Sequence, residues 1–347
     1  MQANRIMTVA DDSGNVKRLA GKIADGGEGS IHAIDGRSDV LVKIYHPAIL
    51  TDTPRCLRLE YKIRAMSQHP ELRVHPHLAW PLLPLQAPGF GWCGYAMWRK
   101  PGTSLRALLG SPLQLARICP HWHRQHLVRL CLDYLDTLEF LAANRALPVD
   151  FNPGNLIIDC ANVRVYFIDC GSFQCQSDGR LYHGESITPD MAAPETLRQS
   201  NAGMCLSTAS VRFSAAMTLF YILTLGNSPY RHRNGDDPVQ NLIHGSCALG
   251  KGAAHALPSG SYYRIWSHLI FDLKELFLRC FCDGHGRPEL RPAVSEWQTA
   301  LHKYNRCLVI GHAEASLVPG KAKAATRYQN HQDPPKTNVQ IHHPQSD

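Results

Sequence analysis

The stretch LPVDFNPGNLIID, residues 147–159, brings an aspartate and an asparagine into one tight turn. Asp150 and Asn155 are five residues apart, with a Pro-Gly pair between them and an apolar run directly after them. Proline and glycine are typical of a turn, and a short run rich in isoleucine predicts a strand. We therefore expect a carboxylate and a carboxamide together at the entrance of a strand. Ordinary turn chemistry would also explain both residues, because Asp and Asn are common in turns.

The composition indicates a folded protein of one large or two ordinary domains. Hydrophobic residues make up 44% of the 347 residues and charged residues 19%, which is typical of a globular chain and not of a disordered one. The formal net charge is +7, but the lysines and arginines are scattered without a long basic run. Because nucleic-acid binding requires a concentrated basic patch, we expect no nucleic-acid partner.

Cysteines and apolar segments favour a reduced, cytoplasmic chain without a dedicated metal cage. The twelve cysteines include no CxxC pair, and the neighbouring Cys280 and Cys282 lack the further ligands of a zinc site. The first residues lack the apolar core of a signal peptide. The apolar run 213–226 is too short to span a bilayer, so no membrane segment is expected in this chain.

The first hundred residues are predicted to form a small lobe rich in strands. Residues 19–45 favour three antiparallel strands, with a glycine-rich first turn and an Asp-Gly pair in the second. A helix is expected over 54–68, where Leu57 and Tyr61 recur at helical spacing. This part of the chain is therefore expected to carry one helix on a β-rich body.

The rest of the chain is predicted to be mainly helical. Leucines recur on one stripe of residues 124–143, and further helices are expected over 212–225 and 264–281. The fold class is therefore α+β with two lobes, and a cleft between lobes is the default place for a ligand. The expected division is 1–100 for the first lobe, 101–311 for the second, and 312–347 for a polar, disordered tail.

Two features of the first lobe could meet a phosphate group. Gly26, Gly27 and Gly29 lie between two strands, which excludes motifs that need a helix after the glycines, but their N–H groups could still bind phosphate oxygens. Lys43 stands inside the apolar strand VLVKIY, where it needs an anion or a carboxylate, and Glu60 on the next helix could supply one. A plain tight turn and a surface lysine with an apolar stem are the alternatives.

A second carboxylate follows another strand. Asp169 ends the apolar stretch VRVYFID and is followed by Cys-Gly. A carboxylate at a strand end suits a Mg²⁺ ligand, and Asn155 could provide a second oxygen. Asp150 would then stand beside the metal, free to accept a proton.

The order of these parts along the chain is that of a protein kinase. After the glycine-rich hairpin, strand lysine, helix glutamate, D-x-x-x-x-N and D-x-G, the triplet Ala193-Pro194-Glu195 follows, and Arg291 precedes a later helix. The sequence resembles the protein-kinase family over about residues 15–305. More narrowly, it resembles bacterial Ser/Thr kinases of the YegI-like group in the stretches GGEGSIHAI, LEYKIRAM, DFNPGNLII, IDCGSFQ and YYRIWSHLIFDLKELF.

The resemblance implies a bilobal protein-kinase-like fold with a small β-rich N-lobe and a larger helical C-lobe. It implies ATP with Mg²⁺ or Mn²⁺ as cofactors and transfer of the γ-phosphoryl group to Ser or Thr hydroxyls of a protein. The YegI-like group further implies a PP2C-type phosphatase and a von Willebrand-type protein as partners. The implied roles are: Lys43 and Glu60 as the pair that holds the α/β-phosphates, Asp150 on the acceptor hydroxyl, Asn155 and Asp169 on the metal, Gly26, Gly27 and Gly29 over the phosphates, Met97 as the gatekeeper, and Trp98 to Lys100 as the adenine hinge. The implied partner of Glu195 is Arg291.

Among the positions that depart from the family pattern, three bear on activity or regulation. Val149 stands where the family has the arginine that meets a phosphorylated activation loop, which argues against that kind of switching. Asn152 replaces a lysine near the γ-phosphate, so a slower enzyme is expected. Val211 replaces the acidic residue that ties down the catalytic loop. Since the implied catalytic and metal-binding residues are all present, an active kinase is preferred over a nucleotide-binding pseudokinase or scaffold, and over a small-molecule phosphotransferase.

Overall fold

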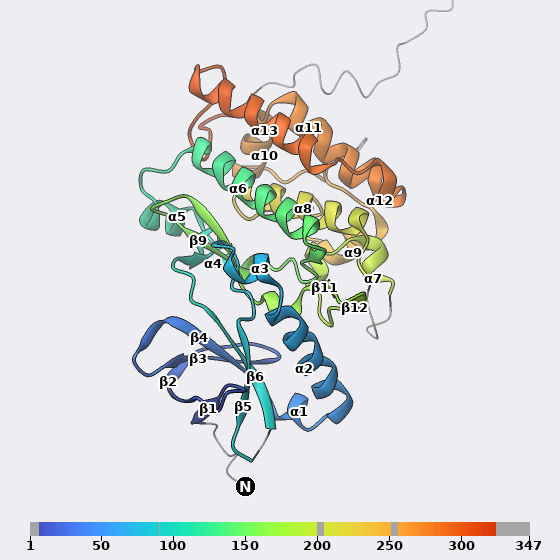
Figure 1. The fold of residues 1–347 in the computed structure, drawn as a ribbon. Coiled ribbons are helices and arrows are strands. Elements are labelled where there is room, and N and C mark those ends of the chain that lie inside the picture. Colours follow the sequence, from blue (N-terminus) through green and yellow to red (C-terminus); the bar gives the residue numbers. More distant parts are fainter. Residues whose placement is uncertain (1–6, 90, 200–204, 251–255, 324–347) are drawn as a thin grey trace, which may run out of the picture.

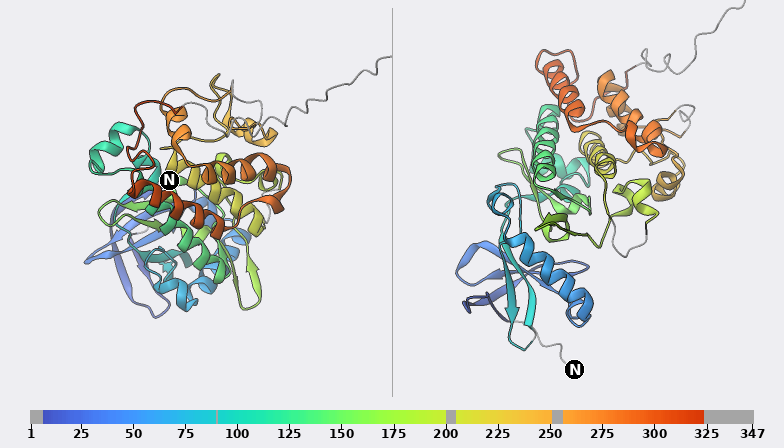
Figure 2. Two further views of the ribbon diagram at one scale, coloured as in Figure 1. Left: turned by 90° about the horizontal axis from the view of Figure 1, so that it is seen from above. Right: turned by 45° about the vertical axis from the view of Figure 1, so that its right-hand side comes forward.

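The protein is described by a computed structural model that covers residues 7–89, 91–199, 205–250 and 256–323 (Figure 1). Two lobes are visible, a strand-rich one from the N-terminal part of the chain and a helical one from the C-terminal part (Figures 1 and 2). The predicted change from strands to helices along the chain is confirmed. No helix in the described ranges has the length and hydropathy needed to cross a membrane.

The first lobe is built on a closed barrel of antiparallel strands, in the order β1-β2-β3-β4-β6-β5. Its strands are β1 Thr8–Ala10, β2 Val16–Asp25, β3 Gly29–Ile34, β4 Arg37–Tyr45, β5 Leu83–Ala87 and β6 Gly91–Trp98. The alternation along β4 explains its two faces: Val40, Val42 and Ile44 fill the barrel, whereas Lys43 and Tyr45 point outward. The three strands predicted over 19–45 are therefore confirmed, and the barrel fixes which face the lysine takes.

The helices α1 Pro47–Leu50, α2 Thr53–Ser67 and α3 Pro70–Val74 follow β4. The buried face of α2 carries Leu59, Ile63 and Met66, which pack into the main hydrophobic core. Leu57 and Tyr61, the residues from which we predicted this helix, are 45% and 56% exposed. The predicted helix is confirmed, but the Leu57–Tyr61 spacing from which it was predicted lies on its solvent side.

The second lobe begins with two small sheets. The chain leaves the barrel at Trp98 and enters the first sheet, of order β10-β9-β7, at β7 Thr103–Ser104. Its other strands are β9 Leu156–Asp159 and β10 Arg164–Phe167. The second sheet, of order β12-β11-β8, is formed by β8 Ala146–Leu147, β11 Gln174–Ser177 and β12 Arg180–Tyr182. The loop around Asp150 therefore runs from one sheet to the other.

Helices complete the second lobe around a core of leucine and aromatic side chains. The helices of the described residues are α4 Leu105–Leu108, α5 Pro112–Ile118, α6 Arg124–Ala143, α7 Pro194–Leu197, α8 Thr208–Leu223, α9 Pro238–His244, α10 Ser261–His268, α11 Phe271–Leu278, α12 Gly284–Gly286 and α13 Val294–Val309. The leucine stripe predicted over 124–143 is buried in α6, which packs against α8 and α13. The helix expected over 264–281 is divided into α10, α11 and a π-helical turn at 279–283.

The start of the predicted tail packs on the second lobe. The Ala315 carbonyl accepts from the backbone N–H of Arg124, and the buried Arg124 guanidinium donates to the carbonyl of Leu317. Arg264 donates to the carbonyl of Gly320. The prediction of disorder from 312 onward is therefore wrong for 312–323, because arginines of the helical lobe bind its backbone. Residues 324–347 lie outside the described residues.

Candidate active site

The quoted loop holds Asp150 in a network of side-chain hydrogen bonds. Asn155 Nδ2 donates to Asp150 Oδ2 at 3.1 Å, and Thr188 Oγ1 donates to Asp150 Oδ1 at 2.5 Å. Burial raises the pKa of Asp150, and the negative charge of Asp169 raises it further, although the two hydrogen bonds act in the opposite direction. The site therefore brings together two carboxylates that sense each other's charge, with a hydroxyl directly on one of them.

Asp169 lies at the end of the β10 segment in a strained backbone conformation. Its φ is +56°, in the left-handed region, which Asp tolerates better than most residues. Both the N–H and the hydroxyl of Ser172 donate to the Asp169 carbonyl, which closes a short 3₁₀ turn. A Cβ added to Gly171 would lie 2.6 Å from the Tyr95 hydroxyl, so only glycine fits at that position of the turn. The backbone thereby directs Asp169 toward the first lobe.

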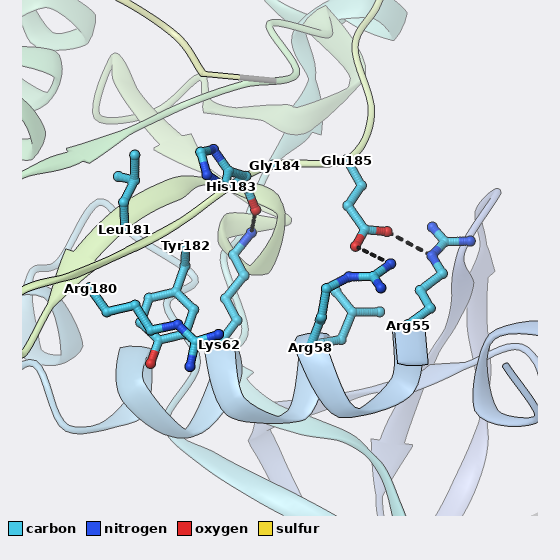
Figure 3. Close-up of a pocket in the computed structure, with 10 residues that line it drawn as sticks. Arg55, Arg58, Lys62, Arg180, Leu181, Tyr182, His183, Gly184 and Glu185 are labelled. Carbon is cyan, nitrogen blue, oxygen red and sulfur yellow. Dashed lines mark hydrogen bonds and ion pairs between the residues drawn. The ribbon is translucent and has the colours of Figure 1, made fainter. Parts of the chain in front are cut away.

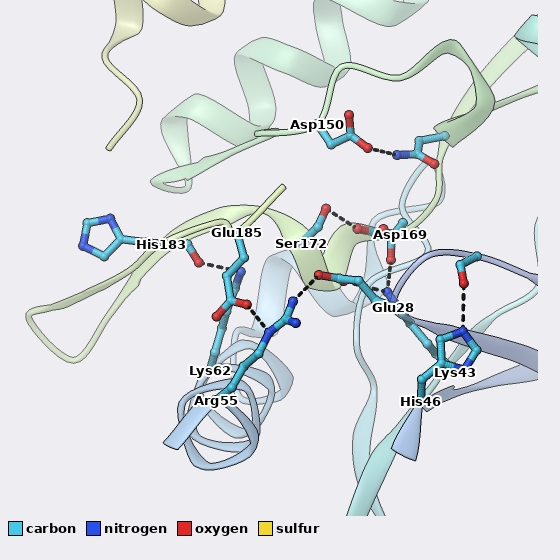
Figure 4. A network of polar contacts seen from close by, with 12 residues as sticks. Glu28, Lys43, His46, Arg55, Lys62, Asp150, Asp169, Ser172, His183 and Glu185 are labelled. Carbon is cyan, nitrogen blue, oxygen red and sulfur yellow. Dashed lines mark hydrogen bonds and ion pairs between the residues drawn. The ribbon is translucent and has the colours of Figure 1, made fainter. Parts of the chain in front are cut away.

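Lys43 meets Asp169 across the two lobes. The Lys43 ammonium lies 2.6 Å from Asp169 Oδ1 and 3.6 Å from Glu28 Oε2, and the residue is 5% exposed (Figure 4). Burial alone would lower the pKa of Lys43, but the charges of Asp169 and other neighbours raise it well above its usual value. Lys43 is therefore held in its charged form.

The predicted pair of Lys43 with Glu60 is wrong for this structure. Glu60 accepts from Arg64, four residues later on the outer part of α2, at 2.9–3.0 Å. The physical reason is the rotated face of α2, which turns Glu60 away from the lysine. The carboxylate that approaches Lys43 from its own lobe is Glu28, in the turn between β2 and β3.

Arg55 extends the network from Glu28 to the segment after β12. Its guanidinium lies 3.1 Å from Glu28 Oε1 and 2.6 Å from Glu185 Oε2. Charges therefore alternate in sign from Asp169 through Lys43, Glu28 and Arg55 to Glu185 (Figure 4). Helix α2 contributes a cation to this network, where the kinase pattern led us to expect a carboxylate.

The three glycines of the β2–β3 turn differ in how strongly the structure requires glycine at their positions. Gly26 N–H donates to the Gly29 carbonyl and closes the turn. A Cβ on Gly29 would lie 2.3 Å from the Ile44 carbonyl, so the close approach of β3 and β4 already requires glycine there. Gly27 has open space around its Cα hydrogens. A Cβ on Gly26 would make only an ordinary contact, 3.6 Å from the Gly29 carbonyl, so strand packing requires glycine at position 29 but not at 26 or 27.

The predicted hinge residues lie at the end of β6. Met97 is buried and pairs with Leu41, whereas Trp98 is partly exposed. The Lys100 ammonium donates to the Pro76 carbonyl at 2.7 Å and lies over the Tyr166 ring. The Lys100 side chain therefore fastens the link between the lobes, and any contact with an adenine would come from the backbone of this segment.

The positions that depart from the kinase pattern have packing roles. Val149 is buried, and a Cβ on Gly184 would lie 2.5 Å from its side chain, so the segment after β12 rests directly on it. Asn152 Oδ1 accepts from Arg106 at 2.9 Å and from the Gly154 N–H at 2.7 Å. Asn152 therefore stabilises the turn of the loop around Asp150 with its own side chain.

The predicted pair of Glu195 and Arg291 is confirmed. Arg291 donates to both carboxylate oxygens of Glu195, at 2.6 and 2.8 Å, and its side chain is fully buried. The guanidinium also donates to the carbonyls of Gly284 and Ala209 and lies over the Phe213 ring. Burial would raise the pKa of Glu195, but Arg291 outweighs it and lowers this pKa.

The donor set suits a magnesium ion that keeps part of its water shell. Asp169 offers a carboxylate and Asn155 an amide oxygen, and both are the hard ligands that Mg²⁺ prefers. In the described ranges, no three His, Cys, Asp or Glu side chains gather as a metal cluster. Two protein ligands fit Mg²⁺ bound together with substrate phosphates, which usually complete its octahedron with water.

Sequence reasoning missed three residues of this network: Glu28, Arg55 and Thr188. Glu28 stands inside the predicted glycine turn, and its charge beside a possible phosphate site was the available signal. Arg55 lies five residues before Glu60 on α2, and its contact with Glu28 depends on how that helix packs. Thr188 lies 38 residues after Asp150, so no local pattern connects the two.

Comparison with known proteins gives relatives of one kind. No model of a known protein family matches the chain. Protein kinase YegI of Escherichia coli K12 is 24% identical over 320 residues, which cover 87% of this chain and 47% of the relative. The protein of the same name from E. coli O157:H7 is 24% identical over 295 residues, 81% of this chain and 43% of the relative. The chain thus spans about half the length of the curated relatives it matches. It is similar to proteins named as kinases, in agreement with the resemblance found in its sequence.

Proposed function

We propose that this chain is a protein kinase of bilobal fold that transfers the γ-phosphoryl group of Mg-ATP to Ser or Thr hydroxyls of a protein. The observation that carries the proposal is the contact between Thr188 and Asp150, because an aliphatic hydroxyl already donates to the carboxylate that would receive an acceptor hydroxyl's proton. The similarity to proteins named protein kinase supports the reaction class.

Asp150 is the proposed proton acceptor and orienting group. Its raised pKa makes it a better base than a solvent-exposed aspartate, and the amide of Asn155 fixes one of its oxygens. An incoming Ser or Thr hydroxyl would take the place of Thr188 on the other oxygen. The small size of this donor favours a Ser or Thr side chain over a larger phenol.

Lys43 is the proposed cation for the nucleotide phosphates. It is buried and charged, and it lies against Asp169, the proposed metal ligand, so phosphate and metal would meet between them. Glu28 is the proposed positioning residue for Lys43 in the role first given to Glu60, and Arg55 holds Glu28 in place. This arrangement moves the orienting carboxylate from the helix to the hairpin.

Asn155 and Asp169 are the proposed ligands of the metal, and the β2–β3 turn with Gly27 is the proposed cover of the phosphates. Mg²⁺ would supply charge for the β- and γ-phosphate oxygens, and ATP would supply the transferred group. The protein's own part is then orientation: Lys43 and the metal ligands hold the phosphates, while Asp150 aims the hydroxyl.

The test is incubation of the purified chain with γ-labelled ATP, MgCl₂ and a mixture of acceptor proteins. The expected result is label on phosphoserine or phosphothreonine, lost when EDTA removes the metal. Nucleotide binding without transfer would support the scaffold instead. Label found on small molecules alone would support a small-molecule phosphotransferase.

A further inference from the structure

A cavity of about 680 Å³ lies outside the proposed catalytic centre, between helix α2 and the hairpin formed by β11 and β12 (Figure 3). Its walls carry four basic side chains, Arg55, Arg58, Lys62 and Arg180, against the single carboxylate of Glu185. A concave surface with such an excess of positive charge concentrates anions. Of its basic side chains, the proposed phosphoryl transfer uses only Arg55, which holds Glu28.

Lys62 is the buried cation of this cavity. It is 4% exposed, and its ammonium donates to the carbonyl of His183 at 2.9 Å (Figure 3). Within the described part of the chain, no carboxylate lies within ion-pair distance of this ammonium, although an ammonium has three N–H donors to satisfy. A buried charge without a counterion is costly, so the cavity is organised for an anion that the protein itself does not provide.

The carboxylate of Glu185 is an anion that the protein itself places at the arginine end of the cavity. Its carboxylate lies 2.6 Å from Arg55 Nε and 3.8 Å from the Arg58 guanidinium (Figure 3). Arg55 is shared with Glu28, whereas Arg58 has only this long contact among the described residues and is 61% exposed in its side chain. One carboxylate therefore leaves Arg58 weakly paired and Lys62 unpaired.

We propose that this cavity binds a small phosphate monoester through Arg58 and Lys62. A phosphate dianion carries three terminal acceptor oxygens and two charges, so it can bind the Arg58 guanidinium and the Lys62 ammonium at the same time. The carboxylate of Glu185, which is bound to Arg55, does not reach Lys62. The cavity has room beyond one phosphate group, and Leu59 and Tyr182 offer apolar surface to the carbon part of the ester. Glu185 is the internal competitor of this ligand.

The proposal is tested by calorimetric titration of the nucleotide-free chain with inorganic phosphate and with glycerol 3-phosphate, at an ionic strength held constant with chloride. Both probes are expected to bind, and the ester is expected to bind at least as tightly as inorganic phosphate. Lys62→Met and Arg58→Gln should each weaken binding about tenfold, the loss expected for one charge-assisted hydrogen bond. Glu185→Gln should strengthen it, because it removes the competing negative charge.

Arg64→Gln is the matched control, since Arg64 lies on the same helix but pairs with Glu60 and Asp12 outside the cavity. It should bind both probes like the parent chain. The melting temperature of each variant without ligand shows that it is folded. Binding that survives in Lys62→Met and Arg58→Gln but disappears in Lys43→Met would place the phosphate at the catalytic lysine and overturn the proposal. Absence of binding to the parent chain would overturn it as well.

Discussion

The pair of Glu195 with Arg291 and the charges around Lys43 are two buried ionic regions of opposite design. Arg291 uses its guanidinium fork on both oxygens of one carboxylate, and backbone carbonyls and an aromatic ring occupy its remaining surface. Lys43 instead lies between Asp169 and Glu28, and Glu28 is shared in turn with Arg55. In the first region each charged group has one charged partner, whereas in the second Lys43 and Glu28 each contact two charged partners.

We infer from this difference that the Glu195–Arg291 pair serves stability and that the charges around Lys43 serve the proposed binding of phosphate. Breaking a bidentate pair whose arginine is fully buried leaves a charge without a substitute partner nearby. A lysine with two carboxylate neighbours can give up one contact and keep the other. An incoming phosphate can therefore take the place of Asp169, the proposed metal ligand, while Glu28 keeps the lysine paired. The two regions should therefore respond to mutation in different measurements, stability for the first and nucleotide chemistry for the second.

The largest effect is expected from Arg291→Met. The change strands Glu195 in a half-buried position, and loss of one partner of a buried pair costs about 3–5 kcal/mol. Urea unfolding followed by circular dichroism measures it. The matched control is Arg279→Met, which removes the exposed pair with Glu296 and should cost about 0–1 kcal/mol. If both variants lose the same free energy of unfolding, the pair of Arg291 with Glu195 contributes no more than a surface ion pair.

A smaller effect is expected from Lys62, the buried cation without a carboxylate. Burial lowers its pKa in the folded protein from 10.5 to about 8, so between these values the unfolded chain binds more protons. The free energy of unfolding should therefore rise with pH across this window and lose that gain as pH falls through about 8. At 1.36 kcal/mol for each pKa unit, the gain reaches about 3 kcal/mol when the window is crossed completely.

The measurement is urea unfolding of the parent chain and of Lys62→Met at neutral pH and at a pH near the upper end of that window. The difference between the two proteins isolates Lys62 from the other titrating groups. The variant should be the more stable protein at neutral pH, and its advantage should shrink as pH rises. A difference in the free energy of unfolding between the two proteins that is the same at both pH values would contradict a buried lysine with a lowered pKa.

The smallest effect is expected from the carboxylates of the first lobe. Glu28→Gln should reduce phosphoryl transfer about tenfold, because it removes the charge that orients Lys43, with a correspondingly modest loss of transition-state stabilisation. Glu60→Gln is the matched change on α2 and should stay within about twofold, since Glu60 binds Arg64. Steady-state kinetics with ATP as the varied substrate distinguishes them. If Glu60→Gln is the more damaged enzyme, helix α2 must turn its other face to Lys43 during turnover.

Helix α6 and the pair of Glu195 with Arg291 could be predicted from sequence for different reasons. The leucine stripe of α6 specifies which face is buried, whereas the partner of Glu195 was implied by the resemblance to protein kinases. The loop around Asp150 was found because its polar residues are close in sequence.

The partner of Lys43 could not be predicted in the same way. Which carboxylate reaches it depends on how α2 rotates when it packs, and Leu57 and Tyr61 gave a helical spacing on the exposed side. Thr188 reaches Asp150 from 38 residues away, and Glu28 approaches Lys43 from a turn next to its strand, so neither contact is specified by a local spacing. Periodicity reports burial within one element and contains no distances between elements.

The most direct test of the account is single-turnover phosphoryl transfer by the parent chain, Asp150→Asn and Asp169→Asn, together with ATP affinity with and without Mg²⁺. Asp150→Asn should transfer phosphate about 10²–10⁴-fold more slowly while binding Mg-ATP like the parent, because its contact is made to the reacting hydroxyl. Asp169→Asn should weaken the binding that depends on Mg²⁺ and the rate together, because it removes charge from the metal site. An Asp150→Asn variant that transfers phosphate as fast as the parent would contradict the account and leave the loop as a turn.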